Sequence, residues 1–149
     1  MANPKHVAIL RAGVICWNNW REIYAGDERL DLSDAELNQI DLTAIKTDKG
    51  YKRINLEGVY LEGAKLNGAH LERANLEGAA LIGAALWKAN LEGADLRYVK
   101  DLTQVQLDQA CGDDKTQLPE KLRDYRIKGC PRDKDESMEK PEDATDKVK

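Results

Sequence analysis

The chain has 149 residues, 42% of them apolar, and a formal net charge of −4. This length allows one domain with a hydrophobic core. The negative charge disfavours binding to nucleic-acid phosphates, which requires clustered Lys and Arg. Phe is absent and Leu and Ala dominate, so we expect a thin and repetitive core.

The N-terminal segment, residues 1–29, has the pattern of a capping helix and its connection. Five apolar side chains follow helical spacing: Val7, Leu10, Val14, Trp17 and Tyr24. Asn3 and Pro4 suit the N-cap and the first turn, and Gly26 suits the end of the helix. The segment has neither a long apolar stretch nor a cleavage site, so we expect no secretory signal, no membrane contact and a cytoplasmic location.

A five-residue spacing of leucines begins after this segment, in "LDLSD", "AELNQ" and "IDLTA", at Leu32, Leu37 and Leu42. The next regular leucine, Leu56, comes 14 residues after Leu42, one residue short of a whole number of repeats. The register therefore breaks at about residues 45–53. We interpret this stretch as a deformed corner or short loop, with Tyr51 in the place of the next leucine.

The main run of repeats follows without interruption. Leucine recurs at 56, 61, 66, 71, 76, 81, 86, 91 and 96, and each is preceded two residues earlier by Ile, Val or Ala. A period of five contains one strand-like step followed by a corner, where Gly often stands. Successive corners that bend the same way produce a coil, and stacked coils bury the column of leucines.

The repeats "ANLEG" at 74–78 and 89–93 and "ADLRY" at 94–98 resemble those of bacterial pentapeptide-repeat proteins. This resemblance implies an all-β solenoid, a right-handed quadrilateral parallel β-helix. We expect it to span residues 30–98 in about three to four coils.

A C-terminal capping segment is expected over residues 99–130. Thr103 and Gln106 form a capping-box pattern that predicts a short helix, with Leu107 and Ala110 on one face and Gly112 as its end. Residues 131–149 carry many charges and few apolar side chains, so we expect them to be disordered.

The three cysteines, Cys16, Cys111 and Cys130, match no zinc or redox motif. They would be free thiols in the cytosol, whereas Cys111 and Cys130 could pair in an oxidising compartment. His6 and His70 have no cysteine at ligand spacing, so no metal or cofactor is expected.

With four repeats per coil, residues twenty apart should stack. Two faces then carry Asn, Asp and Glu and should be acidic, with Asn and Asp supporting the turns. Stacked Glu72 and Glu92 are read as a solvated column rather than a catalytic or cation-binding pair. On the other faces Tyr60, Ile82 and Trp87 form a candidate partner-binding patch, since outward positions have no structural need for Ile or Trp.

These features predict a non-enzymatic protein-interaction or scaffold module. Its protein partner is not identified by the sequence, and a homodimer through the Trp87 face is one alternative. A second alternative comes from the family resemblance, since some members mimic duplex DNA and bind DNA gyrase. The short rod and its half-acidic surface disfavour that role here.

Overall fold

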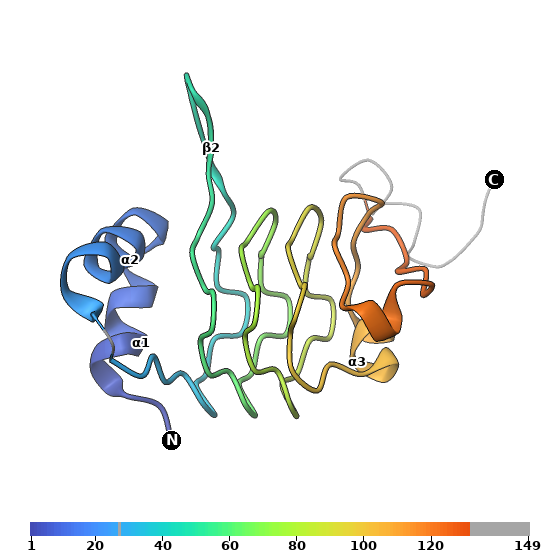
Figure 1. Cartoon of the computed structure of the whole chain (residues 1–149), viewed down its shortest axis with the longest axis horizontal. Helices are drawn as coiled ribbons and strands as arrows, with labels where there is room; N and C mark the ends of the chain where they lie inside the picture. The colour runs from blue at the N-terminus through green and yellow to red at the C-terminus, as the bar shows by residue number, and fades with distance from the viewer. Residues whose placement is uncertain (27, 132–149) are drawn as a thin grey trace.

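The computed structural model describes residues 1–26 and 28–131, so most of the tail predicted to be disordered lies outside the described residues. A stack of coils forms its centre, with helices at both ends (Figure 1). Parallel β-bridges recur every five residues and join positions twenty apart, as between Asn55 and Asn75 and between Tyr60 and Ala80. Each regular coil therefore has four edges of five residues.

The leucines of the repeat fill the interior of this stack. Each of the leucines from 56 to 96 is at most 2% exposed, and the leucine amide donates to a carbonyl of the next coil, as Leu56 does to Asn75 at 2.8 Å. The residue two positions before each leucine is also buried. Burying one leucine contributes roughly 1.5–3 kcal/mol, so the repeated column supplies most of the hydrophobic stabilisation.

The corners of the coil require a left-handed backbone. The residue two positions after each leucine has positive φ, which Gly adopts freely, as at Gly58 with φ of 70°. Arg73, Lys88 and Tyr98 adopt the same conformation without being glycine. The predicted role of Asn and Asp in the turns is confirmed, because the Asn55 Oδ1 accepts a hydrogen bond from the amide of the residue two positions on.

The register break is a β-hairpin inserted between two edges of the first coil. Strands β1 (Ile45–Thr47) and β2 (Gly50–Lys52) pair antiparallel. Before the hairpin the bridges join residues 29 apart, and after it the bridges within residues 55–100 join residues 20 apart. The excess equals the length of residues 45–53. Tyr51 does not take the place of a leucine, because it lies on β2 and is exposed.

The N-terminal segment forms two short helices rather than the single helix we expected. Helix α1 (Pro4–Arg11) is capped by Asn3 as predicted, and α2 (Val14–Trp20) begins after Gly13, whose φ of 107° breaks the helix. A π-helical turn, η1 (Arg21–Ala25), follows and ends at Gly26. The wider π turn changes the side-chain direction, and Tyr24 is exposed instead of buried.

Side chains of these helices bind the backbone of the first coil. The indole of buried Trp17 donates to the Asn55 carbonyl at 2.7 Å. His6 is also buried, and its Nδ1 accepts the amide of Asp31 at 3.1 Å. The Nε2 of His6 must then carry the proton in the neutral ring and donate it to Glu28, 2.7 Å away.

At the other end, helix α3 (Gln104–Gln109) follows the last regular edge. The predicted capping box is present, since Thr103 and Gln106 each bond the other's backbone. The helix ends before Gly112, with Ala110 as its C-cap in an extended conformation. The chain then re-enters the stack, where Gln117 pairs with Asp95, so parallel pairing continues past residue 98.

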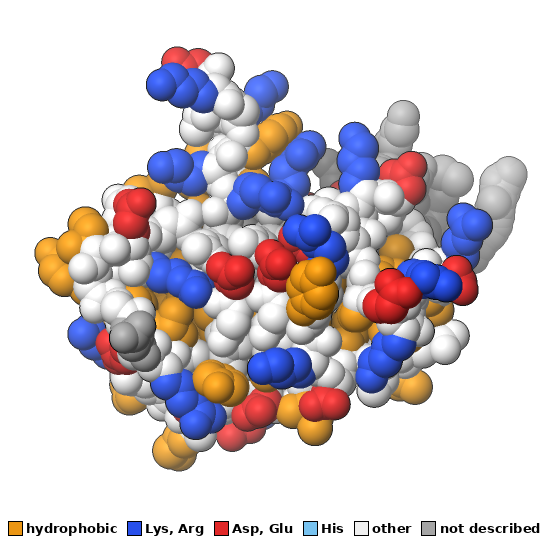
Figure 2. Space-filling model, viewed as in Figure 1, with side chains coloured by type: hydrophobic (Ala, Val, Ile, Leu, Met, Phe, Trp, Pro, Cys, Tyr) orange, Lys and Arg blue, Asp and Glu red, His pale blue; other side chains and the backbone are white. Residues whose placement is uncertain are grey.

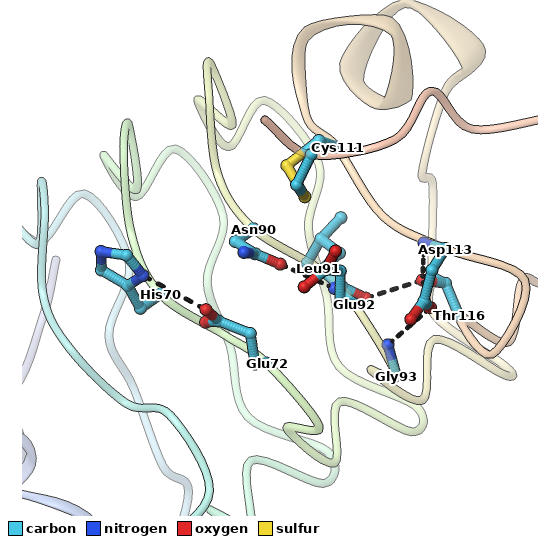
Figure 3. Close-up of a disulfide and its surroundings, with 10 residues drawn as sticks. His70, Glu72, Asn90, Leu91, Glu92, Gly93, Cys111, Asp113 and Thr116 are labelled. Carbon is cyan, nitrogen blue, oxygen red and sulfur yellow. Dashed lines mark hydrogen bonds and ion pairs between the residues drawn. A yellow bond between two sulfur atoms is a disulfide. The ribbon is translucent and has the colours of Figure 1, made fainter. Parts of the chain in front are cut away.

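A disulfide between Cys111 and Cys130 closes the C-terminal segment, which includes the 3₁₀ helix η2 (Glu120–Leu122). Cys111 pairs with Asn90 in the coil, so the disulfide fixes the end of this segment to the stack (Figure 3). The sequence left open whether Cys111 and Cys130 are free thiols or form a disulfide, and the structure shows the disulfide. Cys16 is a free and exposed thiol.

Candidate interaction surface

Ile82 lies at a corner of the coil, where the repeat directs a side chain outward. Its carbonyl accepts a hydrogen bond from the amide of Gly63 in the preceding coil at 2.9 Å. The residue is 49% exposed. Since this backbone position works equally well with Glu or Asn elsewhere in the repeat, the apolar side chain is not required by the fold.

Trp87 occupies the next corner along the same coil. Its amide donates to the Asn67 Oδ1 at 3.0 Å, which fixes the backbone, and the residue is 56% exposed. The Nζ of Lys88 lies 4.5 Å from the centroid of the indole. Between the two corners, Ala85 is the outward side chain and Leu86 points into the core. Ile82 and Trp87 thus stand at the two ends of an edge that carries only a methyl group between them.

Tyr60 lies on the edge that ends at the Ile82 corner, one coil earlier, where it pairs with Ala80. The guanidinium of Arg29 lies 4.0 Å from the centroid of its ring, and Tyr60 is only partly exposed. The structure therefore places Tyr60 and Ile82 on one edge and Trp87 at the far end of the next edge. Tyr60 is the least accessible of the three.

Counting the repeats did not identify Val105 of α3, an apolar residue that is 66% exposed. The buried Gln106 donates from its Nε2 to the carbonyls of Leu81 and Ala84 at 2.8 and 2.9 Å, which fixes α3 at the corner that carries Ile82. Val105 precedes Gln106 in the chain and therefore lies on the helix that is fixed at this corner. Its apolar side chain was a possible signal, but only the docking of the helix shows where it lies.

The stacked acidic residues are engaged with neighbouring polar groups. The Glu72 carboxylate lies 3.3 Å from the Nδ1 of His70 and accepts the Thr43 hydroxyl at 3.3 Å. Figure 3 shows His70 and Glu72 beside Asn90 and Glu92 of the next coil. These contacts make the column polar, but it is less solvated than predicted, because the Glu72 side chain is only 22% exposed and one carboxylate oxygen of Glu92 is buried.

Asp95 is buried and forms an ion pair with Arg97 through two hydrogen bonds. Its carboxylate accepts two hydrogen bonds from the Arg97 guanidinium, at 2.9 and 2.7 Å, and one from the Arg97 amide at 3.0 Å. The Arg97 side chain lowers the pKa of Asp95 below its usual value, and the carboxylate raises the pKa of Arg97. The pair joins an edge to its corner, so its role is to hold the turn.

Within residues 1–26 and 28–131, no group of three or more His, Cys, Asp or Glu side chains is placed to hold a metal ion. None of the helices in this part of the chain is long and apolar enough to cross a bilayer.

A family model described as pentapeptide repeats matches the chain with 8 copies, over residues 54–86 and 74–111. No curated protein gives a significant match. Among solved structures, a pentapeptide repeat protein (Rfr23) from the cyanobacterium Cyanothece 51142 is 33% identical, with a TM-score of 0.35, over 62% of this chain and 69% of that chain. The repeats in the sequence and the five-residue bridges agree with the family model. The chain belongs to the pentapeptide-repeat family, whose fold is a right-handed β-helix.

Proposed function

We propose that the protein is a non-enzymatic interaction module that presents Tyr60, Ile82 and Trp87 to a protein partner. The observation that carries this proposal is the exposure of Ile82 and Trp87 at successive corners, 49% and 56% respectively. Exposed Trp is enriched among residues that dominate binding energy. Family membership is consistent with a repeat protein that has no catalytic activity.

In this proposal the protein is a quadrilateral rod of about three to four coils, and its two end segments cover the ends of the rod as caps. A solenoid exposes apolar side chains and unpaired backbone at its ends unless they are covered. The hydrogen bond from Trp17 to Asn55 at one end and those from Gln106 to Leu81 and Ala84 at the other support this reading. Caps keep the rod from joining end to end and leave its sides for binding.

The surface has an apolar centre and a polar rim, as binding surfaces usually do. Lys88 borders Trp87, and Lys65 on the neighbouring coil forms an ion pair with Glu36 at 3.2 Å. A partner that presents an apolar side chain flanked by carboxylates matches this arrangement.

The test is affinity capture with wild-type protein and an Ile82→Ser, Trp87→Ser variant, analysed by mass spectrometry. The matched control is Ile23→Ser, Tyr98→Ser, which removes two apolar side chains of similar exposure elsewhere on the surface. Circular dichroism checks that all three proteins are folded.

The proposal expects a protein that is recovered with the wild type and the control and lost with the Ile82, Trp87 variant. Sedimentation of the same proteins shows whether that partner is a second copy. Gyrase subunits among the captured proteins would favour the alternative of DNA mimicry. Equal recovery with all three baits would overturn the proposed surface.

A further inference from the structure

The hairpin of β1 and β2 is the most prominent projection from the rod. Figure 1 shows it standing well beyond the corners of the coils. All six strand residues are exposed, and the coil pairs correctly on both sides of the insertion. Since the hairpin buries little of its own surface, its contribution to the hydrophobic core is small, and a role outside the core accounts better for its presence.

The hairpin and its base are strongly basic in an acidic protein. Residues 45–53, "IKTDKGYKR", contain four Lys or Arg and one Asp, whereas the whole chain has a net charge of −4. Figure 2 shows Lys and Arg side chains on the projecting hairpin and along the edge beside it.

The prediction that two faces of the rod are acidic is wrong, because the hollows there are lined by cations as well as carboxylates. A hollow of about 590 Å³ beside the hairpin is lined by three cations and one carboxylate, from Arg21, Lys52, Arg53 and Glu22, together with neutral side chains that include Asn55 and Asn75. A second hollow, of about 570 Å³, is lined by basic and acidic side chains: Arg53, Arg73, Lys115, Glu72, Glu92 and Asp113. The counting of repeats missed most of these cations because they come from η1, the insert and the C-terminal segment, which lie outside the regular repeats.

The base of the hairpin is held firmly in place. The Arg73 guanidinium lies 3.8 Å from the centroid of the Tyr51 ring. The Arg53 Nε donates to the Arg73 carbonyl at 2.8 Å, and the Arg53 carbonyl accepts the Asn18 side chain at 2.8 Å. The arm is therefore fixed at its root by the next coil and by α2, which lowers the entropic cost of binding at its exposed strands.

Each hairpin strand has one free edge, since the described sheet contains β1 and β2 alone. An extended segment of another protein can add to such an edge through backbone hydrogen bonds. Alternation along the strands puts Lys46 on the face of Tyr51 and Lys52 on the opposite face. A strand on either edge would therefore lie close to lysines. We infer that the hairpin is a docking arm for an extended acidic segment of a partner protein.

The charges of the hairpin favour an acidic segment over a second hairpin or a nucleic acid as the binding partner. Two hairpins from separate copies would place lysine against lysine, which is unfavourable across strands. A nucleic acid, which binds through many phosphates, finds only a short basic patch here. A short acidic segment responds mainly to the charges within about 10 Å of it, because salt screens the rest of the protein.

The experiment measures fluorescence anisotropy of labelled probes with full-length protein. The probes are a peptide of alternating Glu and Val, its Lys and Val counterpart, and an oligothymidine of charge matched to the acidic peptide. The test variant is Lys46→Glu, Lys49→Glu, Lys52→Glu. The control, Lys100→Glu, Lys121→Glu, Lys128→Glu, changes three exposed lysines and the net charge equally.

We expect the acidic peptide to bind wild type and control, and the hairpin variant at least about tenfold more weakly, with an affinity that falls as salt rises. The Ile82→Ser, Trp87→Ser variant is expected to bind the peptide like wild type, which separates this inference from the proposed function.

Equal binding of the acidic peptide to the hairpin variant and the control, or no preference over the basic peptide, would overturn the inference. Tighter binding of oligothymidine through the same lysines would also overturn it and identify a nucleic-acid partner. A variant that lacks residues 45–53 and carries Ala44→Gly repeats the test without the arm, in case charge reversal alters the hairpin itself.

Discussion

Ala44 and Ile54 occupy consecutive positions of the repeat although residues 45–53 separate them. The amide of Ala44 pairs with the next coil as the amide of Arg73 does one coil later, and the carbonyl of Ile54 pairs as that of Ala74 does. Arg73 and Ala74 are adjacent in the chain. The hairpin is therefore an insertion into a coil that is otherwise complete, and removing it would join "IDLTA" directly to "INLEG".

A variant without residues 45–53 is expected to fold. Its residue 44 would stand at a corner that requires positive φ, as the equivalent Arg73 does at 65°. Ala is strained there by roughly 1–2 kcal/mol. The deletion with Ala44→Gly should therefore be more stable than the deletion alone, by about 1 kcal/mol in urea unfolding followed by circular dichroism. Loss of cooperative unfolding in both variants would show instead that the hairpin is needed to form the first coil.

The corner conformation makes a second prediction, in which two substitutions act in opposite directions. A Cβ added at Gly58 would meet nothing within 4 Å, so Gly58→Ala should destabilise only through its φ of 70°, by roughly 1–2 kcal/mol. Tyr98 is 72% exposed with φ of 63°, so Tyr98→Gly should stabilise by up to about 1 kcal/mol after the entropy of the unfolded glycine is counted. Shifts of the same sign in urea unfolding would contradict this account.

The sequence predicted the repeat well because each unit is local. Five residues contain a buried leucine, a small partner and a corner, so a fixed register identifies both the core and the outward positions. The same counting placed Ile82 and Trp87 outside, and both are exposed. It also predicted the capping box of Thr103 and Gln106, whose two hydrogen bonds lie within one helical turn.

Features that depend on contacts between distant segments were harder to predict. The break at Gly13 depends on how α1 and α2 lie against the first coil. Helical spacing alone predicted one continuous helix across this residue. The place of α3, which carries Val105, at the Ile82 corner is known only from the hydrogen bonds of Gln106 to the carbonyls of Leu81 and Ala84. The fourteen-residue interval from Leu42 to Leu56 showed that the register changes, but an insertion of residues 45–53 fits that interval only when the bridges on both sides are known.

The disulfide should stabilise the C-terminal segment measurably. Cys111 and Cys130 are 19 residues apart, and closing a loop of that size contributes roughly 3 kcal/mol. A Cys111→Ser, Cys130→Ser variant is expected to unfold at lower urea, and proteolysis should cut near η2 before it cuts the repeats. Thiol titration of denatured wild type should find one free thiol, Cys16, without reductant and three with it. Three free thiols without reductant would rule the bond out.

The control for this prediction is Cys16→Ser, which removes the free thiol and should leave unfolding unchanged. The bond also concerns the expected cytoplasmic location, since disulfides persist mainly in oxidising compartments. In a reducing compartment the segment would be held by its non-covalent contacts alone, such as the pairing of Cys111 with Asn90. The thiol count on protein extracted under alkylating conditions would show which of the two states the cell maintains.

The ion pair of Asp95 and Arg97 should make stability depend on pH in acid. The Arg97 side chain lowers the pKa of Asp95 in the folded protein, below the value of about 3.9 of an unfolded aspartate. The folded state therefore binds fewer protons near that pH, so the stabilisation is present above about pH 4 and is lost as the pH falls through the folded pKa.

Asp95→Asn keeps the side-chain oxygen that accepts the Arg97 amide and removes the charge together with the oxygen that accepts the second guanidinium hydrogen bond. We expect this variant to be less stable than wild type at pH 7, by at most about 1 kcal/mol because the Arg97 side chain is half exposed. The difference should shrink as the pH approaches 2. Asp48→Asn, on the turn of the hairpin, serves as the control. Urea unfolding at several pH values checks this, and a difference that stays constant with pH would show that the charge of Asp95 does not stabilise the corner.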